Sequence, residues 1–154
     1  MKNTILLVIA FFTITCLKAQ TTATEKETAI VAVIHKFFEH FHQGDSSQLR
    51  AMFHTTAKLQ AIKYKNGKAE LSEESLKGLL QAVAQFPKDK KIQEKLLDYK
   101  VQIDADLATV WTPYKFYIND VFSHCGANAF TLIKVDETWL ILNIIDTRRK
   151  EKCE

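Results

Sequence analysis

The residues best suited to chemistry stand near the C-terminal end of the chain: His124, Asp146 and Arg148. A histidine changes charge near neutral pH, so His124 is a candidate acid or base. Asp146 and Arg148 are two residues apart, and on a strand their side chains share one face. They form either a structural ion pair or a ligand site in which Arg148 binds a carboxylate and Asp146 holds it. His124 has a structural alternative too, a hydrogen bond to Asp146 or to a backbone carbonyl.

Four further residues are candidates for ligand contact. Trp111 and Phe130 offer apolar surface, Asn128 offers an amide that orients a ligand, and His54 lies in a predicted loop at the mouth of a pocket. Each also has a structural interpretation, since an aromatic residue in a strand belongs by default to the core. The sequence has no close-spaced metal-ligand set, no phosphate loop and no dinucleotide fingerprint. We therefore expect neither a metal nor an organic cofactor.

Four strands in meander order are predicted to position these residues. Apolar and polar side chains alternate along the first of them, as in a half-exposed strand. A two-residue turn at Asn119-Asp120 is predicted between the second strand and the third. The strands are expected over residues 97–104, 107–118, 121–135 and 138–148.

The register of these strands decides which side chains share a face. The turn at Asn119-Asp120 predicts that Trp111 opposes Asn128, Lys115 opposes His124 and Tyr117 opposes Phe122. A three-residue turn before the last strand predicts that Asn128 opposes Asp146, Phe130 opposes Ile144 and Leu132 opposes Leu142. A slip of one residue would send a whole strand's side chains to the other face.

This register predicts two distinct sheet faces. One has a few polar groups at one end of an apolar surface, which is typical of a small-molecule site. The other is apolar enough to need cover, which predicts a homodimer through the sheet's outer face. The first face has Trp111, His124, Asn128, Asp146, Arg148, Phe130, Leu132, Leu142 and Ile144, and the second has Tyr114, Phe116, Ala127, Ala129 and Ile145.

Three helices are predicted before the sheet. The first follows Thr24 and has an apolar stripe from Ile30 to Phe41, and the second follows Gly44. After a strand at residues 57–65 and a turn at Asn66-Gly67, Ser72 is the expected N-cap of the third helix, which ends at Pro87. Three helices followed by a meander predict an α+β domain with helices on one face of a curved antiparallel sheet.

The first 20 residues have the pattern of a secretory signal peptide. A charged start at Lys2 precedes a short apolar run, and Ala19 stands before a polar segment. We expect cleavage there and a single domain over residues 21–154, secreted or periplasmic and without a membrane anchor. A lipoprotein site at Cys16 is a minor alternative. The net charge of +3 across the 154 residues is too small to predict nucleic acid as a partner.

The cysteines agree with an oxidising compartment. Cys125 and Cys153 are the two that remain after signal removal. They either form a disulfide that ties the C-terminal tail to a strand or stay unpaired. The sequence leaves both open, because a disulfide depends on the distance and orientation of the two residues in space.

Several segments resemble the nuclear transport factor 2-like superfamily, in its secreted bacterial branch called SnoaL-like or "putative lumazine-binding". The most specific are Thr109–Tyr117 and Phe122–Asn128; Trp139–Ile145 with the following Asp146–Arg149 and the pair Phe53-His54 also match. The resemblance covers about residues 25–150. It implies a cone-shaped α+β fold with a pocket between sheet and helices, and commonly a homodimer. It does not imply one function, because the relatives include enzymes, binding proteins and interaction domains.

Three functions therefore stay open. The first is an extracytoplasmic protein that binds a small, partly apolar molecule through Trp111, Phe130, His124, Asn128 and Arg148. The second is a cofactor-independent isomerase, dehydratase or hydrolase in which Asp146 tunes His124 as acid and base. The third is a dimeric protein-interaction module.

Overall fold

The computed structural model describes residues 25–153, so the predicted signal peptide and Cys16 lie outside the described residues. The first helix covers residues 25–43, and Gly44 follows it at a φ of 73°, the left-handed conformation of a helix end. Asp45 then caps α2 (Ser46–Ala51), because its Oδ1 accepts a 3.0 Å hydrogen bond from the Gln48 backbone N–H.

A β-hairpin replaces the start that sequence predicts for the third helix. β1 (Phe53–Lys65) and β2 (Lys68–Glu74) are joined at Asn66-Gly67, whose φ angles of 51° and 75° suit a two-residue hairpin turn. Ser72 is therefore a strand residue, and its hydroxyl donates to the Ala61 carbonyl. The N-cap of α3 (Leu76–Ala84) is Ser75 instead. The prediction of Ser72 as the N-cap was wrong. Both serines are suitable caps, and the pairing of Ser72 with β1 leaves Ser75 as the cap.

The described residues form a seven-stranded sheet in the order β2-β1-β7-β6-β5-β3, with β4 also paired to β5. All neighbours are antiparallel except β1 and β7, which run parallel. The strand predicted over residues 97–104 begins later than expected, at Lys100 (β4). A strand that the sequence did not predict, β3, precedes it and ends at Leu96, and both lie along the same edge of β5. The bounds are β3 Ile92–Leu96, β4 Lys100–Asp104, β5 Leu107–Ile118, β6 Val121–Val135 and β7 Thr138–Arg148.

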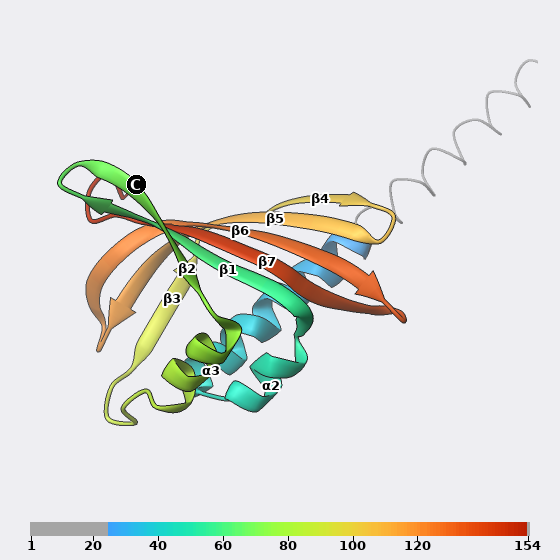
Figure 1. The fold of residues 1–154 in the computed structure, drawn as a ribbon, viewed down its shortest axis with the longest axis horizontal. Coiled ribbons are helices and arrows are strands. Elements are labelled where there is room, and N and C mark those ends of the chain that lie inside the picture. Colours follow the sequence, from blue (N-terminus) through green and yellow to red (C-terminus); the bar gives the residue numbers. More distant parts are fainter. Residues whose placement is uncertain (1–24, 154) are drawn as a thin grey trace, which may run out of the picture.

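The three helices lie together under the concave side of the curved sheet (Figure 1). The first helix buries its apolar stripe there: Ile30 and Ile34 are fully buried, and Phe37 and Phe38 nearly so. Phe130 of β6 lies against Phe37 and Phe38, with ring centroids 5.6 and 6.1 Å away. The core thus joins the first helix to the middle of the sheet. The α+β fold class with helices on the concave face is confirmed.

A β-bulge between β5 and β6 overturns part of the predicted register. Tyr117 opposes Phe122 as predicted, but the next pair is Phe116 with His124, so Ser123 is the extra residue. Every later pair shifts by one: Trp111 opposes Ala129 and Lys115 opposes Cys125. The side chains of β5 therefore exchange faces relative to the prediction.

The pairing of β6 with β7 keeps the partners that matter for the site. Asn128 opposes Asp146 and Phe130 opposes Ile144, as predicted. The turn itself has two residues rather than three, since Val135 opposes Thr138, and Leu132 consequently opposes Ile141 rather than Leu142. An irregularity between Thr131 and Leu132 then shifts the pairing by one residue and restores the predicted partners beyond it.

Cys125 and Cys153 form a disulfide, with their Cα atoms 5.7 Å apart. It holds the C-terminal tail against β6, where the Cys125 and Arg149 backbones also exchange two 2.9 Å hydrogen bonds. Within residues 25–153, no helix has the length and apolar character needed to cross a membrane.

Candidate functional site

A cavity of about 390 Å³ lies between the concave face of the sheet and the helices. Its apolar wall comes from the first helix, α3, Phe86 and the sheet, and its polar groups come from strand positions. The apolar wall consists of Phe37, Phe38, Phe41, Leu59, Leu79, Ala82, Val83, Phe86, Ile92, Phe116, Phe130 and Ile144; the polar and ionisable lining consists of Gln60, Glu74, Glu94, Tyr114, His124, Asn128, Asp146 and Arg148.

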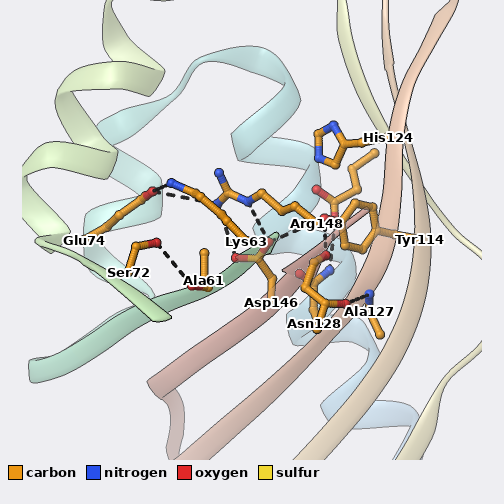
Figure 2. A network of polar contacts seen from close by, with 12 residues as sticks. Ala61, Lys63, Ser72, Glu74, Tyr114, His124, Ala127, Asn128, Asp146 and Arg148 are labelled. Carbon is orange, nitrogen blue, oxygen red and sulfur yellow. Dashed lines mark hydrogen bonds and ion pairs between the residues drawn. The ribbon is translucent and has the colours of Figure 1, made fainter. Parts of the chain in front are cut away.

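An ion pair on β7 forms one part of the polar cluster. Arg148 donates from Nε to Asp146 Oδ2 at 2.7 Å and from Nη2 to Asp146 Oδ1 at 3.2 Å. The Arg148 guanidinium also lies 3.9 Å from Glu74 Oε1, which in turn is 3.7 Å from Lys63 Nζ. Figure 2 shows Arg148 between the two carboxylates. Two acidic side chains thus share this guanidinium. The sequence allowed either an Asp146–Arg148 ion pair or a ligand site, and the ion pair is present.

Tyr114 anchors the same cluster from β5. Its hydroxyl donates to the Thr147 carbonyl at 3.0 Å and lies 3.4 Å from Asp146 Oδ2. Burial, and then the charges of Glu94 and Asp146, raise the pKa of Tyr114, so the hydroxyl keeps its proton and acts as a donor. The sequence register placed Tyr114 and Phe116 on the outer face. The bulge at Ser123 instead brings both to the cavity.

Glu94 of β3 is the most unusual group in the cavity. Asn128 Nδ2 donates to its Oε1 at 2.6 Å. Burial raises the pKa of Glu94 to about 7, the Asn128 hydrogen bond opposes that shift, and Asp146 adds to it. A carboxyl group that titrates near neutrality inside a cavity is a candidate ligand-binding or proton-transfer group.

His42 positions Glu94 from the first helix. Its Nε2 accepts a 2.9 Å hydrogen bond from the Glu94 backbone N–H, so this nitrogen has no proton of its own. Burial lowers the pKa of His42, which agrees with a neutral ring. His42 is therefore a neutral hydrogen-bond acceptor at the end of the first helix.

His124 lines the cavity, but its contacts differ from the predicted pairing. Its ring stacks on Phe116 with centroids 4.8 Å apart, and its Nδ1 lies 3.1 Å from Ser123 Oγ. Burial, and then the charge of Arg148, lower the pKa of His124. No hydrogen bond between His124 and Asp146 is present among the described residues, because Asp146 is held by Arg148 and Tyr114.

Two predicted ligand contacts lie away from this cavity. Trp111 is 47% exposed and opposes Ala129 on the outer face, so its placement beside Asn128 was wrong. His54 bonds locally through Nδ1 to the Thr56 hydroxyl at 2.8 Å and is not part of the lining. The other predicted residues, His124, Asn128, Phe130, Asp146 and Arg148, do meet at the cavity. Their role in binding stays a prediction.

Sequence reasoning missed Glu94, although a signal was present. Ile92, Glu94 and Leu96 share one face of β3, and the first of these is buried in the core. An acidic residue between two apolar residues on one strand face indicates a buried carboxyl that needs a partner. Among residues 25–153, no three or more His, Cys, Asp and Glu side chains are grouped so that they could hold a metal.

The fold is that of nuclear transport factor 2-like proteins, also called the cystatin-like fold. An NTF2-like protein of unknown function from Shewanella baltica is 18% identical with a TM-score of 0.61, over 83% of this chain and 97% of the other. A cystatin-like-fold protein from Novosphingobium aromaticivorans is 13% identical with a TM-score of 0.67, over 88% and 90%. A "Putative Scytalone Dehydratase" from the same species is 14% identical with a TM-score of 0.65, over 84% and 88%.

The chain belongs to the family described as "Putative lumazine-binding", whose model matches residues 25–145. A search of curated proteins finds no match.

Proposed function

We propose that the protein binds a small, partly apolar molecule in the cavity between the helices and the sheet. The observation that carries the proposal is the division of the cavity wall: aromatic and aliphatic side chains form most of it, and the ionisable residues come together from neighbouring strands. This is the usual composition of a small-molecule site, in which apolar area supplies affinity and a few polar groups supply orientation.

Native mass spectrometry of the protein purified from its own compartment tests this proposal. We expect an extra mass that is lost on denaturation. Phe86→Ala removes a partly exposed aromatic side chain from the cavity wall and should reduce the occupied fraction. Tyr64→Ala removes a 57% exposed aromatic side chain from β1, outside the cavity lining, and is the matched control. Equal occupancy in both variants would contradict binding in this cavity.

A second candidate function is proton transfer without a cofactor, and Glu94 is the observation that favours it. A carboxyl with a pKa of about 7 exchanges its proton readily at neutral pH. The likeness in fold to a protein described as a dehydratase is compatible with such chemistry. Incubating the recovered ligand with the protein in D2O should then add deuterium to a carbon of the ligand, and Glu94→Gln should abolish this. Absence of exchange would leave binding as the function.

We also propose a secreted or periplasmic location. The signal-like pattern of residues 1–20 supports it, and so does a disulfide, which persists in oxidising compartments. The expected mature N-terminus is Gln20 or Thr21. Intact-mass analysis of the extracytoplasmic fraction checks this, and an unprocessed chain would contradict it.

A homodimer through the outer sheet face is the last part of the proposal. Trp111, Ala129 and Ile145 are neighbours in register across three strands of this face, and Trp111 is half exposed. Ala129→Glu should then produce monomers in analytical ultracentrifugation. A monomeric wild-type protein at high concentration would argue against the dimer.

A further inference from the structure

Glu94 differs from the other two carboxylic acids of the cavity in its partners. Glu74 and Asp146 both lie within 4 Å of the Arg148 guanidinium. Glu94 forms no ion pair with a basic side chain of residues 25–153, and only its Oε1 is engaged, by Asn128. Its Oε2 therefore remains as a hydrogen-bond acceptor inside a largely apolar cavity. An ionised carboxyl in such surroundings needs a donor, since burying an unpaired charge is costly.

The charges that surround Glu94 are unfavourable for an anionic ligand. Of the residues that line the cavity, three are acidic, whereas only Arg148 and His124 are basic. Arg148 is shared between two carboxylates, and the lowered pKa of His124 keeps its ring neutral at neutral pH. Lys63 balances part of the charge of Glu74 from outside the lining. The lining consequently favours a cation or a hydrogen-bond donor.

We infer that the ligand has an N–H donor head group, most favourably a protonated amine, which binds Glu94 Oε2 while its apolar body lies against the aromatic wall. This inference rests on the proposed small-molecule function and specifies the chemical class of the ligand. The groups that face Glu94 are Asn128 and His124 from β6, Tyr114 from β5, Asp146 and Arg148 from β7, Glu74 from β2 and His42 from the first helix.

Three probes with one skeleton test the inference: 2-naphthylmethylamine, 2-naphthamide and 2-naphthoate, titrated calorimetrically into the disulfide-bonded protein at about pH 8. Their apolar bodies are the same, so differences in affinity report the head group. The amine should bind at least about tenfold more tightly than the carboxylate, with the amide between them. This comparison uses only the wild-type protein and does not depend on the folding of a variant.

The pH dependence identifies the acceptor. As pH falls from about 8 to about 5.5, Glu94 takes up a proton and the affinity for the amine should fall by about tenfold. Glu94→Gln should weaken binding of the amine to a similar extent at about pH 8 and remove the fall, because the glutamine NH2 replaces Oε2 and only donates. The affinity for the amide should change little, since the amide can turn its carbonyl toward this NH2. Glu39→Gln removes the same charge from an exposed position of the first helix and should behave like the wild type.

Three results would overturn the inference. Equal or tighter binding of 2-naphthoate would show that the site accepts anions, and it would leave the binding function standing. Persistence of the same pH dependence in Glu94→Gln would assign it to another group, such as His124 or His42. Absence of binding by all three probes at millimolar concentration would contradict both the inference and the proposed cavity site.

Discussion

At the scale of single residues, the surroundings of Glu94 in β3 change the proton affinity of its carboxyl group. Burial favours the neutral carboxyl, so its pKa rises from 4.5 to about 7. Asn128 donates a hydrogen bond to only one of the two carboxyl oxygens, Oε1. The folded protein therefore binds a proton more tightly than the unfolded chain, and the fold is less stable where this carboxyl is ionised.

The substitution Glu94→Gln should raise the free energy of unfolding by about 2–3 kcal/mol at about pH 8. The glutamine carbonyl still accepts the Asn128 hydrogen bond, and the substitution removes the buried charge. In the wild type, the stability linked to this group is fully present below about pH 4.5 and is lost as pH rises through about 7. Urea unfolding between these pH values checks this, and a difference independent of pH would contradict it.

Arg148 is expected to stabilise the fold through Asp146. The Asp146 side chain is only 12% exposed, so Arg148→Met leaves a nearly buried carboxylate with Tyr114 as its side-chain donor. The loss should be about 2 kcal/mol in urea unfolding. Lys63→Met is the matched control, because the Lys63–Glu74 pair is largely exposed and its loss should cost less than about 1 kcal/mol. Equal losses in the two variants would contradict a special role for Arg148.

At the scale of elements, the centre of β6 is determined by close approach of backbones. A Cβ at Gly126 would lie 1.7 Å from the Thr147 carbonyl oxygen. Gly126 opposes Tyr114, whose hydroxyl bonds that same carbonyl. The absence of a side chain thus lets β7 approach β6 beside the polar cluster, and it keeps Tyr114 directed at Asp146.

Gly126→Ala should therefore destabilise the protein by about 3 kcal/mol, since the β7 backbone must move. Gly78→Ala introduces the same methyl group in α3, where the nearest atom is a serine hydroxyl at 3.1 Å. That control should change stability by less than about 1 kcal/mol. Denaturant midpoints compare the two, and a tolerated Gly126→Ala would show that the strands separate easily.

At the scale of the whole molecule, the disulfide joins the tail to the sheet near the polar cluster. It connects residues 28 positions apart and holds Cys125, which is 2% exposed. The adjoining residues of β6 and β7 include His124 and Arg148, both in the cavity lining. Closing this loop restricts the unfolded chain and so favours the folded one.

Cys153→Ser should lower the free energy of unfolding by about 3.5 kcal/mol, the value expected for a loop of this length. Reduction of the wild-type protein should lower its denaturant midpoint to that of the variant. Adding the same reductant to Cys153→Ser should have no effect, which makes it the control. An unchanged midpoint after complete reduction would show that the tail contributes nothing to stability.

The sequence alone determined the features that depend on local hydrogen bonding and periodicity. These include the apolar stripe of the first helix, the turn at Asn66-Gly67 and the alternation that brings Asp146 and Arg148 to one face. It also predicted the pairing of Asn128 with Asp146. The first three follow from residues close together in the chain. The Asn128–Asp146 pairing matches the prediction because the irregularity between Thr131 and Leu132 offsets the shorter turn.

Only the tertiary structure decided the face of Trp111, the cavity position of Tyr114 and the environment of Glu94. Both faces of β5 have apolar residues, so the sequence pattern is compatible with either register. The bulge at Ser123 selects one of the two registers. The environment of Glu94 comes from two distant segments: His42 of the first helix accepts a hydrogen bond from the Glu94 backbone N–H, and Asn128 of β6 donates one to the Glu94 carboxyl. These contacts join segments far apart in the sequence, and no local pattern contains them.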